Sequence, residues 1–92
     1  MLFRSHVVFL MSPVYQVFLD REVDPQIIAD LPRCKAEFAR RAAARPHTAF
    51  LDYLVEGPIS HDAESFMDTQ HFRLNVARLI EANIAEVLNK KK

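Results

Sequence analysis

Two short apolar runs, separated by a stretch with helical features, constrain the fold of this chain more than any other feature. The first run covers residues 4–11 (RSHVVFLM) and ends at Ser12-Pro13, and the second covers residues 48–55 (TAFLDYLV). Short runs of β-branched and aromatic residues bounded by turn residues are typical of buried strands. Residues 14–19 are also apolar and can continue the first run as a further extended piece.

Helix signals occur twice between the two runs. Asp24 and Pro25 form an N-cap followed by a proline at the first helical position, and Asp30 with Pro32 repeats the pattern. We therefore expect a short helical turn and then a longer helix that reaches Arg45. The inward face of that helix should consist of Cys34, Phe38 and Ala42.

The last third of the chain predicts an amphipathic closing helix, capped by Asp68 or Thr69. Its apolar residues recur at spacings of three and four, which is the pattern of one buried helix face. Leu79 and Ile80 should be fully buried within it, whereas residues 89–92 should form a flexible basic tail of a single domain covering residues 1–92. The apolar stripe consists of Phe72, Val76, Leu79, Ile80, Ile84, Val87 and Leu88.

The order strand, helix, strand, helix predicts a small β-α-β-α unit of the α/β class with a mainly parallel sheet. So few strands leave sheet edges and apolar faces open. We therefore expect self-association to complete the sheet, in the form of a homodimer, because symmetric dimers are the commonest assembly. The interface should use the edge of the first strand or the apolar surface around Val14, Tyr15, Val17 and Phe18.

Composition excludes several classes of function. The 92 residues carry a formal net charge of zero, which gives no basic surface for nucleic acid. Gly57 is the only glycine, so glycine-rich phosphate loops are absent and no cofactor is indicated.

The apolar run at residues 7–11 is far shorter than the ~20 residues of a membrane helix. The single cysteine, Cys34, is typical of a reducing compartment, and we expect a cytoplasmic protein without membrane association.

Asp68 and His71 are the residues most suggestive of catalysis. Three residues apart at a helix start, they can supply a general base and the carboxylate that orients it. Ser12, after the first strand, is a weak nucleophile candidate, because loops after parallel strands carry sites. The simpler interpretation is that Asp68 caps the helix and His71 is a polar residue of its first turn.

Other polar clusters have simpler explanations. Ser60-His61-Asp62 has the residue types of a triad, but consecutive side chains diverge, so a polar turn after Gly57-Pro58 is expected. The potential metal ligands lie within eleven residues of one another, yet no pair has a recognised zinc spacing, so no metal site is predicted. These potential ligands are His61, Asp62, Glu64, Asp68 and His71.

Taken in order, three segments resemble the C-terminal portion of SGNH/GDSL-type hydrolases. These segments are VVFLMSPVY, TAFLDYL and FMDTQHFRLNVARLIEANI, and the resemblance spans residues 7–88. It implies that Asp68 and His71 match the acid and the general base of that family's Asp-x-x-His block. The family's N-terminal nucleophile block, its oxyanion-hole blocks and their Gly-Asp-Ser pattern have no counterpart in this chain.

Two classes of function remain open. One is a non-catalytic, self-associating module that resembles the rear part of the hydrolase fold and can hold a small apolar ligand at a subunit interface. The other is a small esterase or acyl hydrolase in which Asp68 and His71 work with a serine from the same or a neighbouring chain. Because the nucleophile block is missing, the first class is favoured.

Overall fold

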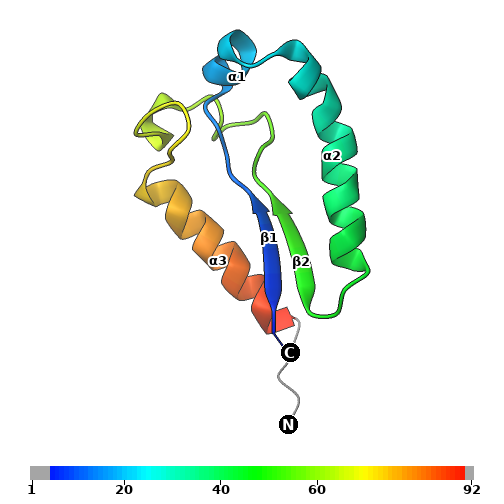
Figure 1. Ribbon diagram of the computed structural model, residues 1–92. Helices are drawn as coiled ribbons and strands as arrows, with labels where there is room; N and C mark the ends of the chain where they lie inside the picture. The colour runs from blue at the N-terminus through cyan, green and yellow to red at the C-terminus, as the bar shows by residue number, and fades with distance from the viewer. Residues whose placement is uncertain (1–4, 91–92) are drawn as a thin grey trace.

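A computed structural model of the chain describes residues 5–90 and contains two strands and three α-helices (Figure 1). Both strands are parallel neighbours in one sheet, with Phe9 opposite Phe50 at the middle of the register. The predicted α/β class with a parallel sheet is thus confirmed. The elements in order are β1 (Val7–Met11), α1 (Gln16–Glu22), α2 (Pro25–Ala43), β2 (Thr48–Asp52), the 3-10 helix η1 (Ala63–Ser65) and α3 (Leu74–Lys90).

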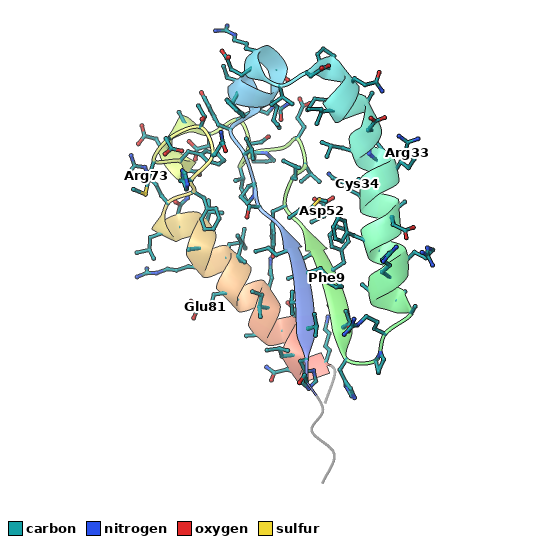
Figure 2. All side chains as sticks on the ribbon, viewed as in Figure 1. Phe9, Arg33, Cys34, Asp52, Arg73 and Glu81 are labelled. Atoms are coloured by element: carbon teal, nitrogen blue, oxygen red, sulfur yellow. The ribbon has the colours of Figure 1, made fainter. Side chains whose placement is uncertain are left out.

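Helices α2 and α3 cover opposite faces of the sheet. The Phe38 ring of α2 stacks on Phe50 at a centroid distance of 6.0 Å and lies 6.1 Å from Phe9, so α2 packs on the face that carries these two side chains. Side chains alternate along a strand, and Tyr53 therefore points to the other face. There its hydroxyl accepts a hydrogen bond from Asn83 Nδ2 of α3 at 2.7 Å. The strands lie between the two helices, and Arg33 and Glu81 point away from the strands (Figure 2).

The strands are shorter than predicted. β1 begins at Val7, not at residue 4, which lies outside the described residues. β2 ends at Asp52 instead of residue 55. Asp52 Oδ1 accepts a hydrogen bond from Leu54 N at 2.9 Å, and its other carboxylate oxygen pairs with Lys35 of α2 at 2.9 Å. A short polar side chain that bonds the backbone two residues on turns the chain, and this ends the strand.

The interpretation of residues 14–19 as an extended piece is wrong, because α1 begins at Gln16. Pro13 is buried and separates β1 from the helix. Gln16 Nε2 donates to Asp20 Oδ1 at 2.9 Å, an i,i+4 pair that stabilises a helix. The run is apolar apart from Gln16, so its periodicity alone did not separate helix from strand.

The two predicted helices after residue 24 form one helix. Asp24 caps α2 as expected, since its carboxylate accepts from Gln26 N at 2.8 Å. Asp30 does not cap a second helix, because it accepts from the Gln26 and Arg33 side chains at 3.1 Å each. Pro32 lies inside the helix, which continues through it to Ala43. Of its predicted inward residues, Ala42 is buried, Phe38 contacts the sheet but is 39% exposed, and Cys34 is exposed.

The closing helix starts later than predicted. It begins at Leu74, so neither Asp68 nor Thr69 caps it, and Arg73 O accepts the first helical hydrogen bonds from Val76 N and Ala77 N at 3.1 Å. Val76 and Ile80 are buried as the stripe requires, whereas Leu79 is 42% exposed, so its predicted full burial is wrong. Asn89 and Lys90 belong to α3 instead of a tail, and residues 91 and 92 lie outside the described residues.

The apolar core is small. Across residues 5–90, the buried hydrophobic residues are Ala42, Phe66, Val76 and Ile80. The same part of the chain has no helix that is both long and apolar enough to cross a membrane.

Candidate functional site

The Asp68–His71 pair lies in a tight loop between η1 and α3. Phe66 and Phe72 form an isolated antiparallel β-bridge at the base of this loop, and Met67 N donates to His71 O at 2.7 Å. The bridge brings residues 68 and 71 together before the helix begins. Sequence reasoning placed this pair on a helix and missed the bridge. The only feature of the sequence that indicates this bridge is the pair of phenylalanines, six residues apart, on either side of the segment that carries Asp68 and His71.

Asp68 organises the loop. Its Oδ1 accepts hydrogen bonds from Gln70 N at 2.9 Å and from His71 N at 3.0 Å. This is the local bonding of an aspartate turn, in which the side chain satisfies backbone N–H groups two and three residues ahead. The predicted capping chemistry is therefore present, but it stabilises the loop and not α3.

The same carboxylate holds the His71 ring. His71 Nδ1 lies 2.8 Å from both Asp68 oxygens. The backbone N–H of Gln70, followed by the hydrogen bond from His71, holds the pKa of Asp68 below its usual value. An ionised carboxylate only accepts hydrogen bonds, so Nδ1 carries the hydrogen of this contact, and in the neutral ring Nε2 is then the acceptor. Both side chains are largely exposed, at 73% for His71 and 60% for Asp68.

The loop lies at the end of the sheet where both parallel strands terminate. Tyr15 N, at the start of α1, donates to Thr69 O at 3.0 Å, and this bond ties the loop to the segment that follows β1. From the other side, Arg73 N donates to Ser65 O at 2.8 Å and Arg73 Nε to Phe66 O at 2.9 Å (Figure 2). In parallel α/β sheets, this carboxyl end of the strands is where functional sites are built.

No serine completes a triad with this pair. Ser12 is exposed and also follows β1, but no hydrogen bond joins it, or any other serine of residues 5–90, to His71. Ser60 Oγ donates to Gly57 O at 3.1 Å, and Ser65 Oγ donates to Asp62 Oδ2 at 2.9 Å. Both of these serines are buried and serve the local structure. The arrangement can accept a proton at His71 Nε2, yet it holds no nucleophile.

The segment Ser60-His61-Asp62 is a polar turn, as predicted. His61 Nε2 lies 3.0 Å from Glu56 Oε2, and Asp62 Oδ1 caps η1 by accepting from Glu64 N at 3.0 Å. The three side chains thus bond to different partners. Throughout residues 5–90, no three His, Cys, Asp or Glu side chains come together as a possible metal site.

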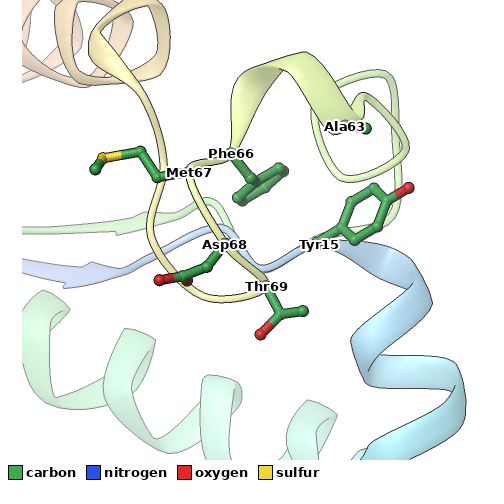
Figure 3. Close-up of a pocket in the computed structure, with 6 residues that line it drawn as sticks. All are labelled: Tyr15, Ala63, Phe66, Met67, Asp68 and Thr69. Carbon is green, nitrogen blue, oxygen red and sulfur yellow. The ribbon is translucent and has the colours of Figure 1, made fainter.

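A hollow of 240 Å³ adjoins the loop (Figure 3). The Tyr15 and Phe66 rings form an aromatic wall, with their centroids 5.7 Å apart. Only the Asp68 carboxylate and the Thr69 hydroxyl add polar side-chain groups beside the Tyr15 phenol. The lining residues are Tyr15, Ala63, Phe66, Met67, Asp68 and Thr69.

Comparison of the chain with protein-family models, with curated proteins and with solved structures gives no match. The resemblance to SGNH-type hydrolases therefore stays a prediction that rests on the quoted segments.

Proposed function

We propose that the chain is a non-catalytic α/β module, similar to the rear part of an SGNH-type hydrolase, that acts by associating with a second copy of itself. The observation that carries this proposal is the imbalance between buried and exposed apolar side chains. Only four hydrophobic residues of the described chain are buried, whereas eight large ones are exposed. The exposed set is Leu10, Val17, Ile27, Phe38, Val55, Met67, Leu74 and Leu79.

Self-association would remove part of this apolar surface from water. Each Å² of apolar surface buried contributes roughly 25 cal/mol, and two-stranded units are at best marginal alone. The exposed residues come from β1, α1, α2, α3 and the loops, so no single loop movement within the chain would cover them. A second copy exposes the same apolar side chains, so two copies can bury them against each other.

Light scattering coupled to size exclusion tests the proposal at micromolar concentration. We expect a mass close to twice the 10.6 kDa of the chain. A monomer at all accessible concentrations would contradict self-association.

One observation favours a second candidate function, a small ester hydrolase that takes its serine from this or a neighbouring chain. His71 Nδ1 is held by Asp68 at 2.8 Å with Nε2 free, which is how a general base is oriented in serine hydrolases. The absent nucleophile makes this the weaker candidate, because base and orienter alone form no acyl-enzyme.

Hydrolysis of p-nitrophenyl acetate separates the two functions. His61→Ala is a matched control for His71→Ala, because His61 also pairs with a carboxylate on the surface. We expect slow, unsaturable hydrolysis that is equal in wild type, His71→Ala, Ser12→Ala and His61→Ala. Saturable turnover that is lost in folded His71→Ala and kept in His61→Ala would replace the non-catalytic proposal with the hydrolase.

A further inference from the structure

The outer edge of β1 has no neighbouring strand within the described chain, because the sheet consists of β1 and β2 alone. Val7 N donates to His47 O at 2.9 Å, and Tyr53 N donates to Met11 O at 2.9 Å. In a parallel ladder, alternate residues of a strand bond to the same neighbour. Val7, Phe9 and Met11 therefore face β2, whereas the N–H and C=O groups of Val8 and Leu10 point to the free edge.

This edge lacks the features that prevent strand pairing. β1 reads VVFLM, with no charge, no proline and no glycine, and Leu10 is 40% exposed. Natural proteins protect exposed edges with charged residues, prolines or bulges. The opposite edge, on β2, ends at Asp52, whose carboxylate is engaged with Lys35 and with Leu54 N. Of the two edges, that of β1 is the better template for another strand.

We propose that a second copy of the chain pairs its β1 antiparallel to this edge, giving a four-stranded sheet in the order β2-β1-β1-β2. This rests on the proposed function, because it names the surface through which the module associates. A twofold axis perpendicular to the sheet generates such a pair, and the two copies use the same strand.

The length of β1 selects one register. Centring the axis on Phe9, the middle residue of β1, pairs all five residues, with Val7 opposite Met11 and Val8 opposite Leu10 of the other copy. Val8 and Leu10 then form hydrogen-bonded pairs, since their groups point outward, and Phe9 lies opposite Phe9 in a non-hydrogen-bonded pair. The apolar side chains of Val8 and Leu10 from both copies gather on the α3 face.

Amide hydrogen exchange on the wild-type protein tests the edge, under conditions where light scattering has established the dimer. We expect the Val8 and Leu10 amides to exchange on the order of a hundredfold more slowly than the Phe50 amide, which points to the free edge of β2. A dimer in which Val8 and Leu10 exchange rapidly overturns this inference alone. A monomer overturns both this inference and the proposed function.

An NOE between two copies tests the proposed register of the β1–β1 pair. Within one strand, the Val7 and Met11 α-carbons are about 13 Å apart, so an NOE between their α-protons arises only between two copies. We expect that NOE in the dimer. Its absence, together with a different set of inter-copy NOEs, would overturn the Phe9-centred register.

A pair of variants at one position tests the hydrogen bonds. Leu10→Pro removes an outward N–H from each copy and leaves the bonds between β1 and β2 in place, whereas Leu10→Ala shortens the same side chain and keeps the N–H. We expect the dimer Kd to rise at least about tenfold more in Leu10→Pro than in Leu10→Ala, with helical circular dichroism retained in both. Equal Kd values in the two folded variants would overturn the proposal, and if Leu10→Pro unfolds, the exchange measurement decides.

Discussion

Asp68 shows, at the scale of a residue, how a structural role can produce geometry that resembles catalytic machinery. One carboxylate accepts two backbone N–H groups and the His71 ring, all within a four-residue segment. Local chemistry is sufficient to explain each of these contacts. A catalytic role needs one more group, a nucleophile near His71 Nε2, which the described residues do not place there.

The pKa of Asp68 leads to a prediction for acid conditions. The Gln70 N–H and the His71 ring hold this pKa below its usual value. The folded state therefore favours the ionised form, and the stabilisation is fully present above the ordinary carboxyl pKa of about 3.9. It is lost as the pH falls through the lower pKa of the folded state. We expect the Asp68 carboxyl resonance in NMR to titrate with a midpoint below that ordinary value.

Asp68→Asn provides the matched control for this pH dependence, because it keeps the shape of the side chain and removes the charge. The free energy of unfolding should fall less steeply below about pH 4 in the variant than in wild type. Glu37, whose pKa Arg40 and Arg41 lower to about 2 through hydrogen bonds, is present in both proteins and cancels from the difference. An Asp68 midpoint at or above the ordinary value would mean that the loop bonds are not formed in solution.

At the scale of elements, α3 separates residues that sequence periodicity had grouped together. Val76 and Ile80 are four residues apart and buried, whereas Leu79 is one position away and 42% exposed. A seven-residue stripe at spacings of three and four covers more of the helix surface than this small sheet can bury. Leu79 therefore remains exposed, although it matches the pattern.

This difference predicts unequal effects of two neighbouring substitutions. Ile80→Ala should lower the free energy of unfolding by roughly 2–5 kcal/mol, because it leaves a cavity in a thin core. Leu79→Ala should cost less than about 1 kcal/mol, and Arg78→Ala should stay within about 0.5 kcal/mol. Urea unfolding of the three variants measures this order. Equal losses at positions 79 and 80 would show that Leu79 is covered in solution.

Pro32 leads to a substitution that should increase stability. It lies inside α2, where proline lacks an N–H for the helix and its ring crowds the preceding turn. Pro32→Ala should raise the free energy of unfolding by about 1–3 kcal/mol, because alanine restores the hydrogen bond and has a far higher helix propensity. Unfolding of this variant beside the exposed control Ala29→Ser measures the effect. A loss of stability would indicate that Pro32 fixes a bend that the sheet requires.

The sequence predicted those parts of the structure that neighbouring residues determine, and it failed where contacts between distant residues determine them. The β1 and β2 runs, the Asp24 cap and the parallel order followed from hydrophobicity and turn residues. The start of α3 did not, because the Phe66–Phe72 bridge forms between residues whose pairing no propensity encodes. A contact between Asp68 and His71 was one of the two interpretations that their spacing allowed, but the support of this loop from Tyr15 depends on a tertiary hydrogen bond to Thr69. Asp30 and Pro32 match the pattern of a second helix start but lie inside one continuous helix, because a proline destabilises a helix without always ending it.

At the scale of the whole molecule, the chain has the secondary structure of an α/β domain without its usual share of core. Two strands provide only one central pair of facing side chains for α2, at Phe9 and Phe50. Larger α/β sheets bury both faces and leave few edges. Here both outer edges lie open within the described chain, so stability and association are expected to depend on each other.

This dependence makes the thermal midpoint a function of protein concentration. If folded chains associate and unfolded chains do not, association stabilises the native state by mass action. A hundredfold rise in concentration should raise Tm by several degrees, because an added stabilisation of 1 kcal/mol shifts Tm by about 4–8 °C in a domain of this size. Circular dichroism from about 2 to 200 μM measures the shift, and Leu10→Pro serves as the control with weakened association. A Tm that stays constant in wild type over that range would show that the thin core folds on its own and that the open edges do not contribute to its stability.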